Sequence, residues 1–255
     1  MAGATGSANP LRSLTWPIAV LVAIVVGAAW YVTWATADFT MAFLAVPMAA
    51  PTGPGLAAAF VVLVVMMVAM MLPSALPMVL AYRGLTRLEG GRPVRPADAI
   101  GTALFVLPYF LVWGAFSVVA LLGLMGLGLA GPFTGALVLV PAVVVIAAGL
   151  YQFTRAKEVC LSHCESPMGF VMHHWRSGRA GAVRMGLRHA MYCVGCCWLF
   201  MVVLFVAGAM SLVWMGIVSV FIFAEKVGSQ RFPVSRAIAV VLLAFGGVLA
   251  AQTLL

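Results

Sequence analysis

Long apolar stretches, separated by short polar or small-residue segments, dominate the pattern of hydrophobic and polar positions along the chain. Seven such stretches cover about residues 14–36, 56–80, 99–125, 133–153, 189–209, 211–225 and 234–254. They are continuous rather than alternating, so they predict membrane-spanning helices and not barrel strands. A helix also satisfies its backbone polar groups internally, as lipid requires. We therefore expect an all-α, polytopic transmembrane helix bundle, a single integral membrane domain over residues 1–255 with the lipid bilayer as a partner.

The first stretch, 14–36, has a second interpretation. Ala35-Thr36-Ala37 resembles the cleavage site of a secretory signal peptide. The apolar run is longer than a usual signal core, and only Arg12 precedes it among basic residues. We therefore expect an uncleaved helix, and cleavage would leave the topology of the remaining spans unchanged.

Composition supports a membrane protein. Of the 255 residues, 65% are hydrophobic and only 8% are charged, against roughly 25% charged in an ordinary soluble domain. This balance excludes a soluble globular enzyme and also a disordered, solvating chain. The net charge of +8 does not predict nucleic-acid binding here, because basic residues of such a chain contact anionic lipid at the cytoplasmic face.

The basic residues indicate the topology. All 14 of them fall in the N-terminal tail or in the segments that follow the second, fourth and sixth stretches. By the positive-inside rule, the N-terminus is then cytoplasmic and the C-terminus external. The same rule favours separating the fifth and sixth spans at 208–211. Segment 154–188 is expected to be a basic cytoplasmic loop, and the location a bacterial inner (cytoplasmic) membrane.

All five cysteines and all four histidines lie between Cys160 and Cys197. At about 100° per helical residue, the fifth span carries four of them within an arc of about 100°, near its cytoplasmic end: His189, Cys193, Cys196 and Cys197. If the preceding segment is helical, three more share one of its sides: Cys160, His163 and Cys164. A fold that brings the two segments together would converge up to seven soft ligands.

Thiolate and imidazole ligands point to a metal site. They select Cu(I), Zn²⁺ or an iron–sulfur cluster over hard cations, and the residues alone leave the choice among these open. Disulfides are not expected on the cytosolic side. The alternatives are thiol redox chemistry and simple packing, since a free cysteine is a small hydrophobe. His173 and His174, next to Trp175, are interpreted first as residues of the membrane surface.

A second group of soft atoms lies in the stretch 56–80. Met66 and Met70 are one helical turn apart, and Pro73 and Pro77 follow them and can kink the helix. Thioethers suit Cu(I), so both methionines are candidate ligands of a metal relay. Packing is the favoured alternative, because methionine fills irregular gaps.

Several blocks together resemble a known family. They are residues 66–77, Tyr151-Gln152 with Lys157, residues 160–167, residues 186–198, Gly208-Ala209-Met210, Trp214-Met215 and Glu225-Lys226. Over about residues 60–230 the chain is similar to the bacterial family described as predicted metal-binding integral membrane proteins, also called domain of unknown function 2182. The resemblance implies metal binding, often labelled as copper-related, and no established activity. In many members the position of His163 is basic.

The motifs of energy-driven transport are missing. No Gly-rich nucleotide-binding loop with Lys-Ser/Thr is present. None of the six acidic residues falls in the middle of a span, where proton-coupled transporters keep one. An ATP-driven or proton-driven pump is therefore disfavoured. Glu225 and Lys226 are expected to form an ion pair at the membrane interface.

The sequence thus favours membrane-embedded binding and handling of a thiophilic metal, with Cu(I) expected first, over an enzyme. A metal donor, a metal acceptor or a larger membrane complex is the expected protein partner. Two alternatives stay open. One is a membrane thiol–disulfide oxidoreductase that uses Cys193 and Cys196, and the other is an accessory or structural subunit in which the metal staples a loop.

Overall fold

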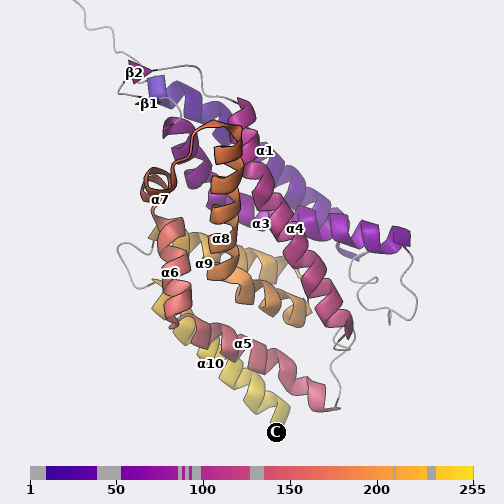
Figure 1. Cartoon of the computed structure of the whole chain (residues 1–255). Coiled ribbons are helices and arrows are strands. Elements are labelled where there is room, and N and C mark those ends of the chain that lie inside the picture. The colour runs from indigo at the N-terminus through magenta and orange to yellow at the C-terminus, as the bar shows by residue number, and fades with distance from the viewer. Residues whose placement is uncertain are drawn as a thin grey trace, which may run out of the picture.

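The computed structural model describes residues 10–38, 53–85, 88–89, 92–93, 99–126, 135–208, 211–228 and 234–254. Within these ranges the chain is helical except for a few connecting residues and one pair of two-residue strands (Figure 1). The strands, β1 (Leu88–Glu89) and β2 (Arg92–Pro93), pair antiparallel. This confirms the expectation of an all-α protein. Most of the predicted loop 37–55, together with Arg95 and Arg231, lies outside the described residues.

The long helices follow the apolar stretches closely, and two shorter helices lie outside them. In chain order they are α1 (Pro10–Ala35), α3 (Gly53–Leu85), α4 (Ala99–Gly126), the 3₁₀ helix η1 (Gly135–Leu139), α5 (Val140–Tyr151), α6 (Arg155–Glu165), α7 (Pro167–His174), α8 (Gly178–Gly208), α9 (Leu212–Gly228) and α10 (Val234–Leu254). The predicted break between the fifth and sixth stretches is present, because α8 ends at Gly208 and α9 begins at Leu212.

Five of the described helices are long and apolar enough to cross a membrane. The qualifying segments are Trp16–Ala35, Phe60–Gly84, Ala99–Ala120, Gly178–Val206 and Val234–Leu254. A sixth crossing arises if Leu137–Tyr151 and Arg155–Glu165, which meet at a bend of 67°, form one broken span. Helix α9 has 17 residues, fewer than the roughly 20 of a typical span. The count of about seven spans therefore stays a prediction.

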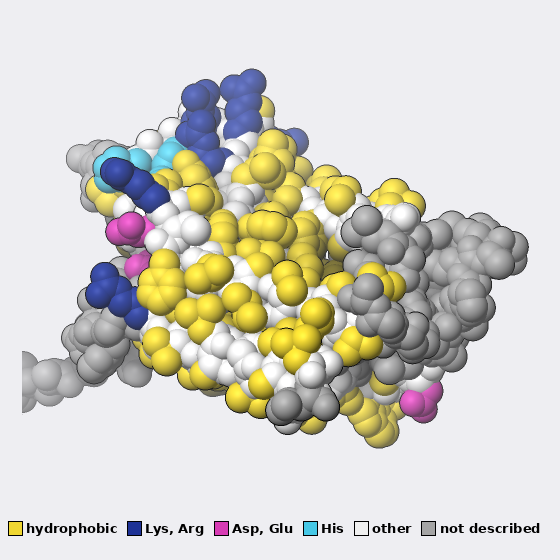
Figure 2. Space-filling view, turned by 90° about the horizontal axis from the view of Figure 1, so that it is seen from below, with side chains coloured by type: hydrophobic (Ala, Val, Ile, Leu, Met, Phe, Trp, Pro, Cys, Tyr) yellow, Lys and Arg dark blue, Asp and Glu magenta, His cyan; other side chains and the backbone are white. Residues whose placement is uncertain are grey.

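Large apolar side chains cover much of the outer surface. Leu111 is 64% exposed, Val119 69% and Val213 70%. Figure 2 shows a face made largely of hydrophobic side chains, with Lys, Arg and His side chains gathered toward one side of it. Apolar area of this extent is unfavourable in water and matches the interior of a bilayer. The fold is thus compatible with a multi-pass membrane protein.

Helix α8 is the central element of the bundle. It packs against α4, α5, α6 and α9, while α10 packs on α5 and α1 packs on α3 (Figure 1). Gly186 permits the close approach of α8 to α4, because a Cβ atom there would collide with the backbone carbonyl of Phe105. The main core cluster includes the three cysteines of α8 and four methionines of α3, namely Met66, Met67, Met70 and Met71.

Segment 154–188 is not the loop that its polarity predicts. It forms α6, α7 and the first turns of α8. The Thr154 hydroxyl caps α6 by accepting a hydrogen bond from the backbone N–H of Lys157, at 3.3 Å. Pro167 is the first residue of α7, a position where its missing N–H costs nothing. Hydropathy overlooks these helices because α6 and the first turns of α8 carry several charged residues and α7 has only 8 residues.

The early start of α8 also corrects the position of the cysteines along their helix. The helix begins at Gly178 and has 31 residues, whereas the apolar stretch predicts a start near residue 189. Cys193 therefore lies in the middle of α8 rather than in its first turns. The added N-terminal turns carry Arg179, Arg184 and Arg188, all exposed.

Candidate metal centre

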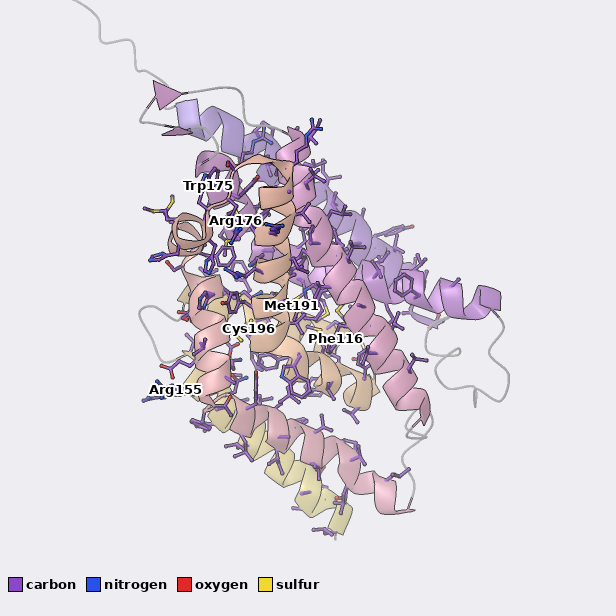
Figure 3. All side chains as sticks on the ribbon, viewed as in Figure 1. Phe116, Arg155, Trp175, Arg176, Met191 and Cys196 are labelled. Atoms are coloured by element: carbon purple, nitrogen blue, oxygen red, sulfur yellow. The ribbon has the colours of Figure 1, made fainter. Side chains whose placement is uncertain are left out.

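Three cysteines of α8 form a compact sulfur triad. The Sγ atoms of Cys193, Cys196 and Cys197 all lie within 4.8 Å of one another. Residues spaced i, i+3 and i+4 share one face of a helix, so local geometry alone brings them together. Each side chain is at most 1% exposed. Cys196, labelled in Figure 3, lies on the part of α8 that packs against α6.

Helix α6 adds two further cysteines beside this Cys193–Cys196–Cys197 triad. Cys164 is buried, and its thiol lies within hydrogen-bonding reach of Cys196. Cys160 is half-buried and packs against Gly195, where a Cβ atom would lie only 2.5 Å from the Cys160 sulfur. Glycine at 195 thus allows α6 to approach α8. The Tyr151 hydroxyl of α5 also contacts this position, because it donates a 2.6 Å hydrogen bond to the Gly195 carbonyl. All five cysteines are free thiols.

Polar groups from α3, α4 and α9 converge on Cys193. The Lys226 ammonium donates to the Ser74 hydroxyl at 3.0 Å and to the Cys193 sulfur at 3.1 Å. The Tyr109 hydroxyl donates to the Met71 carbonyl and lies 3.3 Å from the same sulfur. Four helices therefore hold this one thiol in place.

The buried ammonium of Lys226 needs a negative partner. Lys226 is 6% exposed, and an ammonium removed from water costs several kcal/mol unless it is paired. The neighbouring carboxylate is engaged elsewhere, because Glu225 accepts a 2.7 Å hydrogen bond from Lys157. Among the described residues, the nearest group that can carry a negative charge beside Lys226 is a Cys193 thiolate. The arrangement therefore favours an anionic sulfur site.

The ion pair of Glu225 corrects an expectation from the sequence. Glu225 pairs with Lys157 on α6 and not with its neighbour Lys226. Both members of the pair are buried at 1% exposure, and Lys157 lies 4.7 Å above the Phe200 ring. The pair is thus a buried contact that joins α6 to α9, rather than an ion pair at the membrane interface.

His189 lies one turn before Cys193 but does not join the triad. Its ring is 4% exposed and stacks between Phe105 and Tyr109, with centroid distances of 6.1 and 5.6 Å. Neither ring nitrogen has a hydrogen-bond partner among the described residues. Two unsatisfied nitrogens in a buried ring are unusual in a folded protein, so His189 is a candidate donor to a ligand.

The comparison with protein families adds a description to this geometry. A family model, PpoB2, described as copper chaperone, matches residues 60–249. The chain belongs to this copper chaperone family. The match covers the triad and every residue named above that contacts it. No curated protein and no solved structure matches the chain. The copper-related part of the resemblance seen in the sequence is confirmed.

His163 does not belong to the triad, although it lies on α6 with Cys160 and Cys164. Its half-buried ring stacks on Tyr192 at 4.0 Å between centroids. Its Nδ1 atom lies 2.8 Å from the Val159 carbonyl oxygen. The expected convergence of seven ligands is therefore not found. Cys164 lies beside Cys196, whereas His163 contacts α8 through Tyr192, the residue before Cys193.

The two candidate methionines are buried in the same core as the triad. Met66 is 0% exposed and Met70 is 1% exposed. Helix α3 continues through Pro73 and Pro77 without a break. Helix α3 is linked to Cys193 by other groups than these two thioethers. The Ser74 hydroxyl bonds Lys226 and the Met71 carbonyl bonds Tyr109, and both of these partners contact the Cys193 sulfur.

Sequence reasoning missed Lys157, Lys226, Ser74 and Tyr109. One signal was available, because the chain has only two lysines among its 14 basic residues. Both are buried, whereas the arginines of α8 are exposed. A guanidinium suits the aqueous surface and bidentate contacts, while a lysine presents one compact charge that fits beside a single sulfur or carboxylate.

Proposed function

We propose that the protein binds Cu(I) through Cys193, Cys196 and Cys197, and hands it to a partner protein. The observation that carries this proposal is the buried sulfur triad in a chain of the copper chaperone family. Cys164, beside Cys196, is a further ligand in this proposal. Cys160 and His189 border the site and serve during entry or exit of the metal.

Charge supports Cu(I). One Cu⁺ ion bound by two thiolates and one neutral thiol of the triad carries a net charge of −1, which the Lys226 ammonium neutralises. Soft thiolates and the neighbouring thioethers of Met66 and Met70 suit this ion. Zn²⁺ is the alternative cargo, because the triad with Cys164 offers the four sulfurs of a tetrahedral site. An iron–sulfur cluster draws on the same donors.

Elemental analysis of the full-length protein, purified in detergent, tests the site. We expect copper at about one equivalent in the wild type and its loss in the double variant Cys193→Ser/Cys196→Ser. Cys160→Ser is the matched control, because Cys160 lies outside the triad, and it should retain copper. Zinc or iron in place of copper would show that the protein binds a different metal. Stoichiometric copper in the double variant would show that Cys193 and Cys196 are not the ligands.

We further propose a single integral membrane domain in a bacterial inner membrane, with seven spans, a cytoplasmic N-terminus and an external C-terminus. This makes the protein one of the predicted metal-binding membrane proteins that it resembles. At 1.5 Å per residue α8 is about 46 Å long, longer than the roughly 30 Å of hydrocarbon. Its arginine-bearing turns then project into the cytoplasm. Reporter fusions at residues 90 and 255 test the orientation.

Burial of the sulfurs argues against the oxidoreductase alternative. A catalytic dithiol needs an accessible thiolate that can form a mixed disulfide. Cys193 is 0% exposed and Cys196 is 1% exposed. A metal ion without its carrier is small enough to reach such a site, whereas a protein thiol is not.

A further inference from the structure

Two histidines, one on α6 and one on α7, lie next to each other. The rings of His163 and His174 have their centroids 5.8 Å apart, and both side chains are half-buried. Two imidazoles bound to one ion through bonds of about 2.0 Å place their ring centres roughly 5 to 6.5 Å apart. The observed separation falls in this range.

Local hydrogen bonds prepare both rings for a metal. His163 Nδ1 lies 2.8 Å from the Val159 carbonyl oxygen, and His174 Nδ1 lies 3.0 Å from the Phe170 carbonyl oxygen. A carbonyl only accepts, so each Nδ1 is the protonated nitrogen. In the neutral ring this leaves the Nε2 lone pair available as a metal ligand, and imidazole is a good ligand for copper.

Aromatic contacts connect this pair to the interior. The Phe170 ring lies 4.7 Å from the His174 ring and 5.8 Å from the His189 ring, centroid to centroid. Tyr192 stacks on His163 and directly precedes Cys193 in α8. His189, buried and with both nitrogens unpartnered among the described residues, shares the Phe170 contact with His174 and lies one helical turn before Cys193.

We propose that His163 and His174 form an entry site that accepts Cu(I), and that His189 passes the ion to the Cys193–Cys196–Cys197 triad. This proposal rests on the proposed function of the triad as the copper site. It assigns a role to the two orphaned nitrogens of His189, which the triad by itself does not use.

The surroundings of the entry site define the form in which copper arrives. A pocket of about 580 Å³ beside His174 and Tyr192 is also lined by Arg176, Arg184 and Arg188. Figure 3 places Trp175 and Arg176 near the start of α8, at the end away from α5. Three guanidinium groups repel a free cation and attract an anion. The ion is therefore delivered as an anionic Cu(I) complex, and added salt slows its delivery.

Copper transfer from a coloured donor tests the entry site. The full-length protein in detergent is mixed with the anionic Cu(I)–bicinchoninate complex, and the loss of colour gives the rate and the final amount transferred. For His163→Gln/His174→Gln we expect the rate to fall about tenfold or more, the scale of losing a metal-orienting group. The final amount should stay unchanged. His189→Gln should slow transfer in the same way.

His173→Gln is the matched control. His173 also bonds its own helix through Nδ1, at 2.8 Å from the Gly169 carbonyl oxygen, but it is exposed and lies in the same helix as His174. It should load at the wild-type rate. The single variants His163→Gln and His174→Gln each remove the pair, so a folding defect in the double variant would not leave the proposal untested.

The outcomes separate the two proposals. Wild-type transfer rates in the histidine variants would overturn the entry site while leaving the triad intact. A final amount lowered by one equivalent at an unchanged rate would make the pair a separate storage site, and would also overturn the relay. Failure of the wild type to retain more copper than Cys193→Ser/Cys196→Ser would instead refute the proposed function.

Discussion

The ammonium nitrogen of Lys226 lies 3.1 Å from the sulfur of Cys193, and both side chains are buried. This contact joins α9 to α8 at the sulfur triad. In the proposed copper-bound state, the positive charge of Lys226 would offset the negative charge of the thiolates that bind Cu(I).

Replacing Lys226 by Met tests this coupling. The neutral side chain removes the counter-charge of the thiolates, so we expect copper affinity to fall about 10- to 100-fold. The metal-free protein should lose little stability, because an apolar side chain at 226 removes the desolvation cost of the buried ammonium together with its pairing to Cys193. Chelator competition measures the affinity, and thermal unfolding in detergent measures the stability. Arg236→Met, at an exposed basic residue of α10, is the control; an equal loss of affinity there would contradict the coupling.

The ion pair of Lys157 and Glu225 should behave differently. Lys157→Met leaves the Glu225 carboxylate buried and unpaired, at a cost of about 3–5 kcal/mol. The double variant Lys157→Met/Glu225→Leu should recover most of this loss, because an apolar pair replaces the ionic one. A double-mutant cycle on unfolding free energies measures the difference. If the double variant recovers none of the lost unfolding free energy, the charges themselves are required for stability.

Gly195 controls the distance between α6 and α8. In Gly195→Ala the new Cβ atom would lie 2.5 Å from the Cys160 sulfur, and overpacking of this kind costs about 1–3 kcal/mol. We expect a lower unfolding temperature and weaker copper binding, as Cys164 moves away from Cys196. The variant Gly195→Ala/Cys160→Ala removes the obstructing sulfur and should restore both. A single variant with wild-type properties would refute the role of this contact.

Gly186 controls the approach of α8 to α4. A Cβ atom at this position would collide with the backbone of Phe105, which cannot move aside as a flexible side chain does. Gly186→Ala should therefore destabilise the protein strongly. Gly216→Ala is the matched control, since a Cβ atom there has no atom within 4 Å among the described residues. The unfolding temperatures of the two variants in detergent check the prediction. Equal temperatures would contradict it.

Local patterns in the sequence determine a large part of this protein. Continuous apolar stretches predict the long helices, because the backbone in lipid must satisfy its own hydrogen bonds. The spacing of Cys193, Cys196 and Cys197 places three sulfurs on one helical face. The triad therefore needs only the α8 helix to form, and both features are confirmed in the structure.

Only the tertiary structure determines what surrounds the triad. Lys226, Ser74 and Tyr109 come from three helices that are far apart in the chain. Which cysteines of α6 meet the triad depends on how α6 packs against α8, and the small size of Gly195 permits a close approach of the two helices at Cys160. Periodicity along one segment reports which residues share a face, but it carries no information on which distant side chain will meet that face. Charge pairing and close backbone contact make that choice, and both arise only once the helices pack.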